Sequence, residues 1–136
     1  MIDCETIIYN QLKDAVTAAL PDLPIHWSAV PVTEQSAFPF VMCYEIDNAV
    51  NTDYSDSGNI ERIANLSYQV EIYSNRDGKR MECKTIARAI DDAFNAMGLA
   101  RMSLQSVGNL NDNTIYRMVG RYSCSVDADL NIYKRR

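Results

Sequence analysis

The chain has 136 residues, of which 47% are hydrophobic, and this is enough for a single domain over 1–136 with its own core. Its formal net charge is −5 and its sequence pI is about 4.7, so the molecule as a whole repels nucleic acid rather than attracting it. No segment approaches the roughly 20 consecutive apolar residues that a membrane span needs. We therefore expect a soluble, unexported protein with no membrane partner.

The first predicted element is an amphipathic helix from residue 3 to about residue 20. Its apolar residues recur at the spacing of one helix face, and Asp3 is placed to cap the first turn. The apolar residues of this face are Cys4, Ile7, Ile8, Leu12, Ala15, Val16 and Ala19. Pro21 ends the helix, and a short strand is predicted over 25–30.

Three longer segments alternate as β-strands do. The first begins near Phe38 and reaches about residue 47, and both of its faces carry apolar residues. The segments 60–73 and 114–127 alternate more strictly, with one apolar and one polar face. The two apolar faces consist of Ile60, Ala64, Leu66, Tyr68, Val70 and Ile72, and of Tyr116, Met118, Gly120, Tyr122, Cys124 and Val126.

The remaining segments complete an α+β pattern. Residues 47–59 are rich in Asn, Thr, Asp, Ser and Gly and predict a mobile loop or a hairpin tip. A second amphipathic helix is predicted over 77–97 with Gly98 as its terminator, followed by a strand over 99–107. Ile132 and Tyr133 can add a short edge strand to a C-terminal tail that begins at about 128. This order predicts a mainly antiparallel sheet with two helices packed on one face.

The sequence carries no catalytic, cofactor-binding or metal-binding signature. His26 is the only histidine, and GxSxG, CxxC, GxxxxGK[ST] and GxGxxG are all missing from the sequence. The acidic residues near 53–61 lack the spacing of a calcium loop. We expect no enzyme activity, no cofactor and no metal site. The cysteines, each in a predicted element, are expected to be buried thiols. They are Cys4, Cys43, Cys83 and Cys124.

Arg62, Arg117 and Arg121 lie in the two strictly alternating strands. One interpretation is a solvated sheet face with cross-strand charge pairs to residues such as Glu61 or Glu71. The other is contact between subunits, because arginine is enriched at protein interfaces. The eight tyrosines are compatible with both interpretations.

Three segments of the chain resemble the tail terminator, or tail completion, proteins of long-tailed bacteriophages and prophages, which are minor tail proteins. The segments are ERIANLSYQVEIYSN over 61–75, GKRMECKTIARAIDDAFNAMG over 78–98 and NLNDNTIYRMVGRYSCSVD over 109–127. The strand start Phe38-Pro39-Phe40-Val41 is also similar to that family.

This resemblance implies a virion tail protein that is assembled in the host cytoplasm. Its subunits would form a ring, usually a hexamer, on the head-proximal end of the tail tube. The ring would end tube polymerisation and offer a surface to the head connector or neck protein. DNA would pass through its lumen without specific binding, which agrees with the acidic net charge.

In such a ring, the loop at 47–59 and the tail beyond 127 are expected to contact a neighbouring ring, with Tyr54, Tyr133, Arg135 and Arg136 as candidate contact residues. The three strand arginines are expected to lie between subunits. A head-tail joining (neck) protein is a close alternative, and a small-ligand-binding or regulatory α+β domain is an alternative of another class. A hydrolase that uses Cys124 or Cys83 with His26 is disfavoured, because both thiols fall on apolar faces.

Overall fold

The computed structural model describes the whole chain except residues 34, 36, 51–62, 109–113 and 134–136. The described residues form two helices and six strands, and they confirm the predicted α+β class. In chain order the elements are α1 (Glu5–Ala19), β1 (His26–Ser28), β2 (Phe40–Val50), β3 (Ile63–Ser74), α2 (Lys79–Met97), β4 (Ala100–Ser106), β5 (Tyr116–Asp127) and β6 (Ile132–Tyr133).

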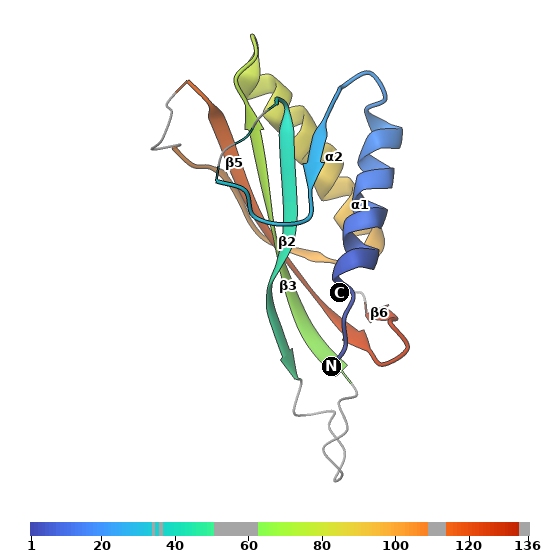
Figure 1. Cartoon of the computed structure of the whole chain (residues 1–136). Coiled ribbons are helices and arrows are strands. Elements are labelled where there is room, and N and C mark those ends of the chain that lie inside the picture. The colour runs from blue at the N-terminus through green and yellow to red at the C-terminus, as the bar shows by residue number, and fades with distance from the viewer. Residues whose placement is uncertain (34, 36, 51–62, 109–113, 134–136) are drawn as a thin grey trace.

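The strands form one mainly antiparallel sheet in the order β1-β2-β3-β5-β4, with β6 paired to the far end of β5. All long ladders are antiparallel, and only β1 runs parallel to its neighbour β2. Both helices lie on the same side of this sheet (Figure 1). The opposite side is called the open face here. This two-layer arrangement is the one that the order of the elements predicts.

The main core lies between the helices and the sheet. The apolar alternation predicted for the two long strands is confirmed, because those residues of β3 and β5 that the structure describes are buried or packed against this core. Gly120 keeps the alternation without a side chain, and a Cβ there would lie 3.0 Å from Leu104 Cδ1 and 3.3 Å from Tyr122 Cε1. Leu104 of β4 and the Tyr122 ring therefore use the space that this glycine leaves.

The buried face of α1 is narrower than predicted. Ile8, Leu12 and Val16 are fully buried, whereas the side chain of Ile7 is 44% exposed. Ala15 and Ala19 are also exposed. The helix starts at Glu5, and Asp3 stabilises its first turn from outside, with its Oδ1 accepting the Glu5 N–H at 3.1 Å.

The C-terminus of α2 is closed by Gly98, as predicted. Gly98 has a φ of 97°, a left-handed conformation that costs glycine little because it has no Cβ. The Leu99 N–H donates to the Phe94 carbonyl at 2.9 Å and the Gly98 N–H to the Asn95 carbonyl at 3.1 Å. Leu99 is buried beyond this cap, so the turn leads α2 directly back into the core.

Strand β2 buries side chains on both faces. Val41 and Cys43 point toward the helices, whereas Phe40 and Met42 join Tyr73 in a second, smaller core on the open face. Val32 and Phe38, from the segment before β2, pack against this second core.

The second half of β2 was predicted less accurately. A register shift between Glu45 and Asp47 marks a β-bulge, after which the alternation of the strand is offset. The strand continues to Val50, so the first part of the predicted 47–59 loop is strand. The rest of that predicted loop lies outside the described residues.

Candidate functional site

The most elaborate polar arrangement of the described chain surrounds Glu71, in the middle of the open face. Glu71 lies on β3 between Met42 of β2 and Val119 of β5, and only 4% of it is exposed. A carboxylate is buried to this extent only where hydrogen bonds and an opposite charge replace its water. Here the strands on both sides of β3 supply these groups.

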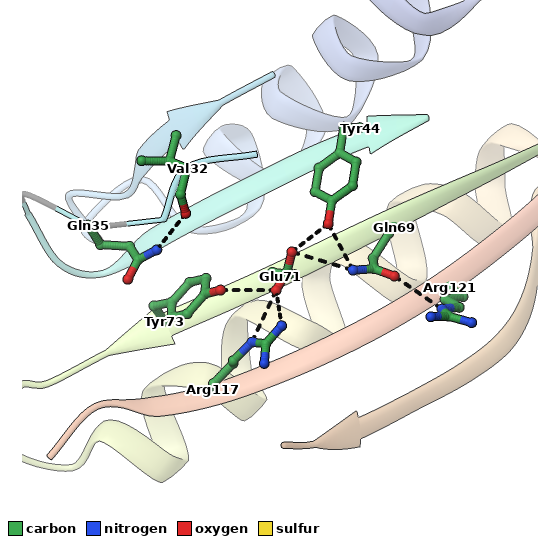
Figure 2. A network of polar contacts seen from close by, with 8 residues as sticks. All are labelled: Val32, Gln35, Tyr44, Gln69, Glu71, Tyr73, Arg117 and Arg121. Carbon is green, nitrogen blue, oxygen red and sulfur yellow. Dashed lines mark hydrogen bonds and ion pairs between the residues drawn. The ribbon is translucent and has the colours of Figure 1, made fainter. Parts of the chain in front are cut away.

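Figure 2 shows the donors that converge on this carboxylate. The Tyr44 hydroxyl of β2 donates to Oε2 at 2.6 Å, and the Tyr73 hydroxyl donates to Oε1 at 2.9 Å. Arg117 of β5 donates to Oε1 from Nε at 3.0 Å and from a terminal nitrogen, which forms an ion pair with Glu71. The Arg117 guanidinium also lies over the Tyr73 ring, 5.8 Å from its centroid.

The network extends along the sheet toward β4 through Gln69. The Gln69 Nε2 donates to the Tyr44 hydroxyl at 2.8 Å, and the Gln69 Oε1 accepts from Arg121 Nε at 3.1 Å. Arg121 is exposed, so this end of the network is at the protein surface (Figure 2). Cross-strand contacts thereby connect β2, β3 and β5 in one row of polar side chains.

The electrostatics of the network keep Glu71 ionised and its phenol neighbours neutral. Burial by itself would raise the pKa of Glu71, but the hydrogen bonds from Tyr44, Arg117 and Tyr73 outweigh it and hold this pKa below its usual value. Burial and the adjacent carboxylate raise the pKa of Tyr44 and of Tyr73 to about 12. The network is therefore suited to fixing side chains in place, and it holds no group poised to exchange a proton near neutral pH.

Beyond this network the open face is lined by small polar residues. The Ser125 hydroxyl donates to Asn65 Oδ1 at 2.8 Å across the β3–β5 ladder. Ser123 is 8% exposed, and its Oγ has no hydrogen-bond partner within the described part of the chain.

The structure brings together only some of the residues expected from the sequence. The cross-strand charge pair is confirmed for Arg117 and Glu71, whereas Arg121 contacts Gln69. Tyr133 lies in the predicted edge strand, opposite Ser125 of β5. The other candidates fall outside the described residues, namely Tyr54, Arg62, Arg135 and Arg136.

Sequence reasoning missed Tyr44, Gln69 and Tyr73 as members of the network. A usable signal exists, because Gln69 and Tyr73 have the same parity as Glu71 in β3. The cross-strand position of Tyr44 opposite Gln69 depends on the register of β2 and β3, which is fixed only in the folded sheet.

The cysteines are buried thiols, as predicted. Burial raises the pKa of Cys43 and of Cys83 to about 12, which makes both poor nucleophiles at neutral pH. His26 is exposed in β1. Within the residues that the structure describes, no group of His, Cys, Asp and Glu is arranged to hold a metal ion, and no helix could cross a membrane.

A second surface feature is an open groove of about 360 Å³ between α2 and β4. Its floor includes Leu104 and Met118, and charged side chains of both signs surround it. The charged residues are Lys84, Arg88, Asp91, Asp92 and Arg101. Asp91 has two polar contacts through its Oδ1, which accepts a hydrogen bond from the Tyr122 hydroxyl at 2.8 Å and lies 3.5 Å from Arg101 Nη1 in an ion pair.

Comparison with known proteins identifies the fold. No family model matches this chain, and no curated protein matches its sequence. A solved structure described as "Virion of native gene transfer agent (GTA) particle" contains a similar chain, with a TM-score of 0.61 and 20% identity over 91% of this chain and 94% of that one. A second solved chain has a TM-score of 0.57 and 15% identity over 100% of this chain and 99% of its own length. At these identities the comparisons show a shared fold over the whole domain.

Proposed function

We propose that this protein is a structural subunit of a phage-like virion, and that it forms a ring at the head-proximal end of the tail tube. The observation that carries the proposal is the fold shared almost end to end with a chain of a gene transfer agent virion. Because the match covers nearly all of both chains, it concerns the complete domain rather than one common motif.

The sequence resemblance to tail terminators supports the finer part of this proposal. Its segments coincide with β3, α2 and β5, which form the centre of the sheet and the helix that covers it. Two unrelated kinds of comparison, one of sequence segments and one of whole folds, thus favour the same class of particle. In this role the ring ends tube growth and presents a surface to the head connector.

The polar open face supplies contacts of the kind that such a ring needs. The Glu71 network holds Tyr44, Gln69 and Arg121 in fixed positions, so that Arg121 is presented to a neighbouring subunit with less conformational freedom to lose. Arg117 acts mainly inside the subunit, through Glu71. Arg62, Tyr54, Tyr133, Arg135 and Arg136 remain proposed contacts with a neighbouring subunit or ring.

The proposal is tested by deleting the gene in the source of the protein and imaging the particles by electron microscopy. We expect tails of irregular, excessive length and heads without tails, and we expect the expressed protein to restore uniform tails. Tails of normal length that lack heads would instead indicate a head-tail joining protein. Complete, infectious or transducing particles without this protein would contradict both assignments.

The groove between α2 and β4 favours a second candidate function, a small-ligand-binding or regulatory domain. It combines apolar residues with charged side chains of both signs, which can fix the orientation of a charged ligand. A thermal-shift screen with charged metabolites checks this candidate. A stabilising compound whose effect disappears in Arg88→Ala would support it, with Lys13→Ala, on the exposed side of α1, as the control.

A further inference from the structure

Among the residues that the structure describes, the sheet has two different edges without a neighbouring strand. On one side β1 pairs only with Phe40–Met42, so within the described chain β2 has no strand neighbour on that side from Cys43 to Val50. On the other side β4 is the last strand, and most of its residues are exposed. Uncovered strand edges are ready to pair with another chain.

The backbone of β4 presents hydrogen-bonding groups to the outside. The Val107 N–H donates to the Arg117 carbonyl at 2.9 Å, so the backbone N–H and C=O groups of Val107 point toward β5. Because the backbone groups of successive residues point to alternate sides of a strand in an antiparallel ladder, the N–H and C=O groups of Leu104 and Ser106 point away from β5. The regular stretch after the bulge between Arg101 and Ser103 can therefore accept a further strand.

The β2 edge is acidic. Asp47 is exposed on the open-face side and Glu45 lies on the helix side of the strand. Asp3 and Glu5 are close enough to Glu45 to act on it, and after burial they contribute to the raised pKa of that carboxyl. Acids this close repel each other, and a cation near them relieves the repulsion.

Cations lie on both faces of the sheet at or next to the β4 edge. Arg121 lies on the open-face side beside Ser103, and Arg101 projects on the helix side with 55% of its side chain exposed. Lys84 and Arg88 border the adjoining groove, where Asp91 and Asp92 offset part of this charge. On each face of the sheet, the β4 edge therefore has a cation and the β2 edge has an acid.

We infer that copies of this chain pair edge to edge, with β4 of one subunit alongside residues 43–50 of β2 in a second copy. The inference rests on the proposed ring and specifies the contact that builds it. In the joined sheet Asp47 lies on the same face as Arg121 of the next subunit, and Glu45 lies on the same face as its Arg101. Backbone hydrogen bonds across the seam continue the sheet from one copy into the next.

The topology fits a closed ring. The contact joins two different edges, so it is heterologous, and repeated rotation about one axis closes such contacts into a ring. Strands β2 and β4 run in opposite directions, because each step from β2 through β3 and β5 to β4 is antiparallel. A rotation about an axis along the strands preserves these directions, so the seam is antiparallel like the other long ladders.

The test uses two charge-reversed proteins and light scattering of the full chain. Glu45→Lys/Asp47→Lys makes both edges basic, and Arg101→Glu/Arg121→Glu makes both edges acidic. We expect the wild type to assemble, each variant alone to stay monomeric, and a 1:1 mixture to assemble again because unlike edges then meet. Recovery in the mixture also shows that both variants are folded. Assembly of either variant alone, or no recovery in the mixture, would overturn the inference.

Matched controls separate edge contacts from net charge. Lys13→Glu/Arg80→Glu and Asp14→Lys/Asp22→Lys make the same charge changes at exposed positions outside the strands. We expect these controls to assemble as the wild type does. If they also dissociate the ring, net charge rather than the edges governs assembly, and the inference fails.

A proline provides the second variant, directed at the backbone. Ser106→Pro removes an N–H that points away from β5, so we expect it to abolish assembly while the thermal unfolding temperature stays near that of Ser106→Ala. A Ser106→Pro protein that is folded and still assembles would overturn the inference. A wild type that stays monomeric at all concentrations would also overturn it. The proposed function has its own test in the gene deletion, so the two can fail separately.

Discussion

Glu71 is the residue on which the order of the open face depends most. Its carboxylate is buried, and removing one partner leaves a charge without its compensation. Replacing both members of such a pair is often less harmful than replacing one. The losses of unfolding free energy from single substitutions in this network are therefore not expected to add when both partners are replaced.

The first prediction concerns the ion pair. Arg117→Gln is expected to lower the free energy of unfolding by about 2 kcal/mol, since a hydrogen-bonded charge is lost beside a buried carboxylate. Because 27% of the Arg117 side chain is exposed, water limits the loss. Glu71→Gln/Arg117→Gln should lose less than the sum of the single changes, as measured by urea unfolding. Arg121→Gln, at the exposed end of the network, serves as the control, and an equal loss there would contradict the prediction.

The second prediction concerns pH. The pKa of Tyr44 and of Tyr73 is about 12 in the fold and about 10 in an unfolded chain, so their contribution is complete below pH 10 and is lost as the pH rises through 12. Chemical unfolding followed across this range should show a decline that is smaller in Tyr44→Phe/Tyr73→Phe. An equal alkaline decline in the double variant would refute the assignment of this pH dependence to the two tyrosines.

The pKa of Glu71 is lowered instead, so its contribution to stability is present above the pKa of an unfolded glutamate and is lost as the pH falls through the folded value.

At the scale of elements, Gly98 connects α2 to β4 through a left-handed turn. Gly98→Ala is expected to cost about 1 kcal/mol of unfolding free energy, because a Cβ disfavours this conformation. Gly108→Ala is a suitable control, since a Cβ there meets nothing within 4 Å. Thermal denaturation followed by circular dichroism checks both, and equal stability of the two variants would argue against the cap.

The elements themselves were predictable where one periodicity dominates. Strands β3 and β5 have a single apolar face, and α2 ends at a glycine, so local sequence fixes both their type and their buried side. Strand β2 has two apolar faces and a bulge near Ile46, and no local pattern says which face meets the helices. That choice follows from the segment containing Val32 and Phe38, which covers one face only in the folded state.

The candidate site was predictable only in part, for a related reason. Alternation placed Arg117 and Glu71 on one face and suggested their pairing. The contribution of Tyr44 requires the register between β2 and β3, and the uncovered edges require the complete strand order. Both are long-range properties of the sheet, which single-sequence patterns do not encode.

At the scale of the whole molecule, acidic and basic groups are separated between the two sheet edges. Ring assembly is therefore expected to weaken as salt rises from low concentration through about 0.15 M, where the screening length is about 8 Å. Light scattering against salt concentration measures this, with neutral sugar at matched viscosity as the control. Assembly that strengthens with salt would indicate an apolar contact instead of the charged edges.

The burial of the four thiols makes each of them a probe of local opening in its own part of the fold. Cys4 precedes α1, Cys43 is in β2, Cys83 is in α2 and Cys124 is in β5, so each reports on a different part of the fold. A small alkylating reagent reaches a thiol only when its own surroundings open. The order in which the four thiols are alkylated would thus reveal which part of the fold opens first, with no substitution introduced into the chain.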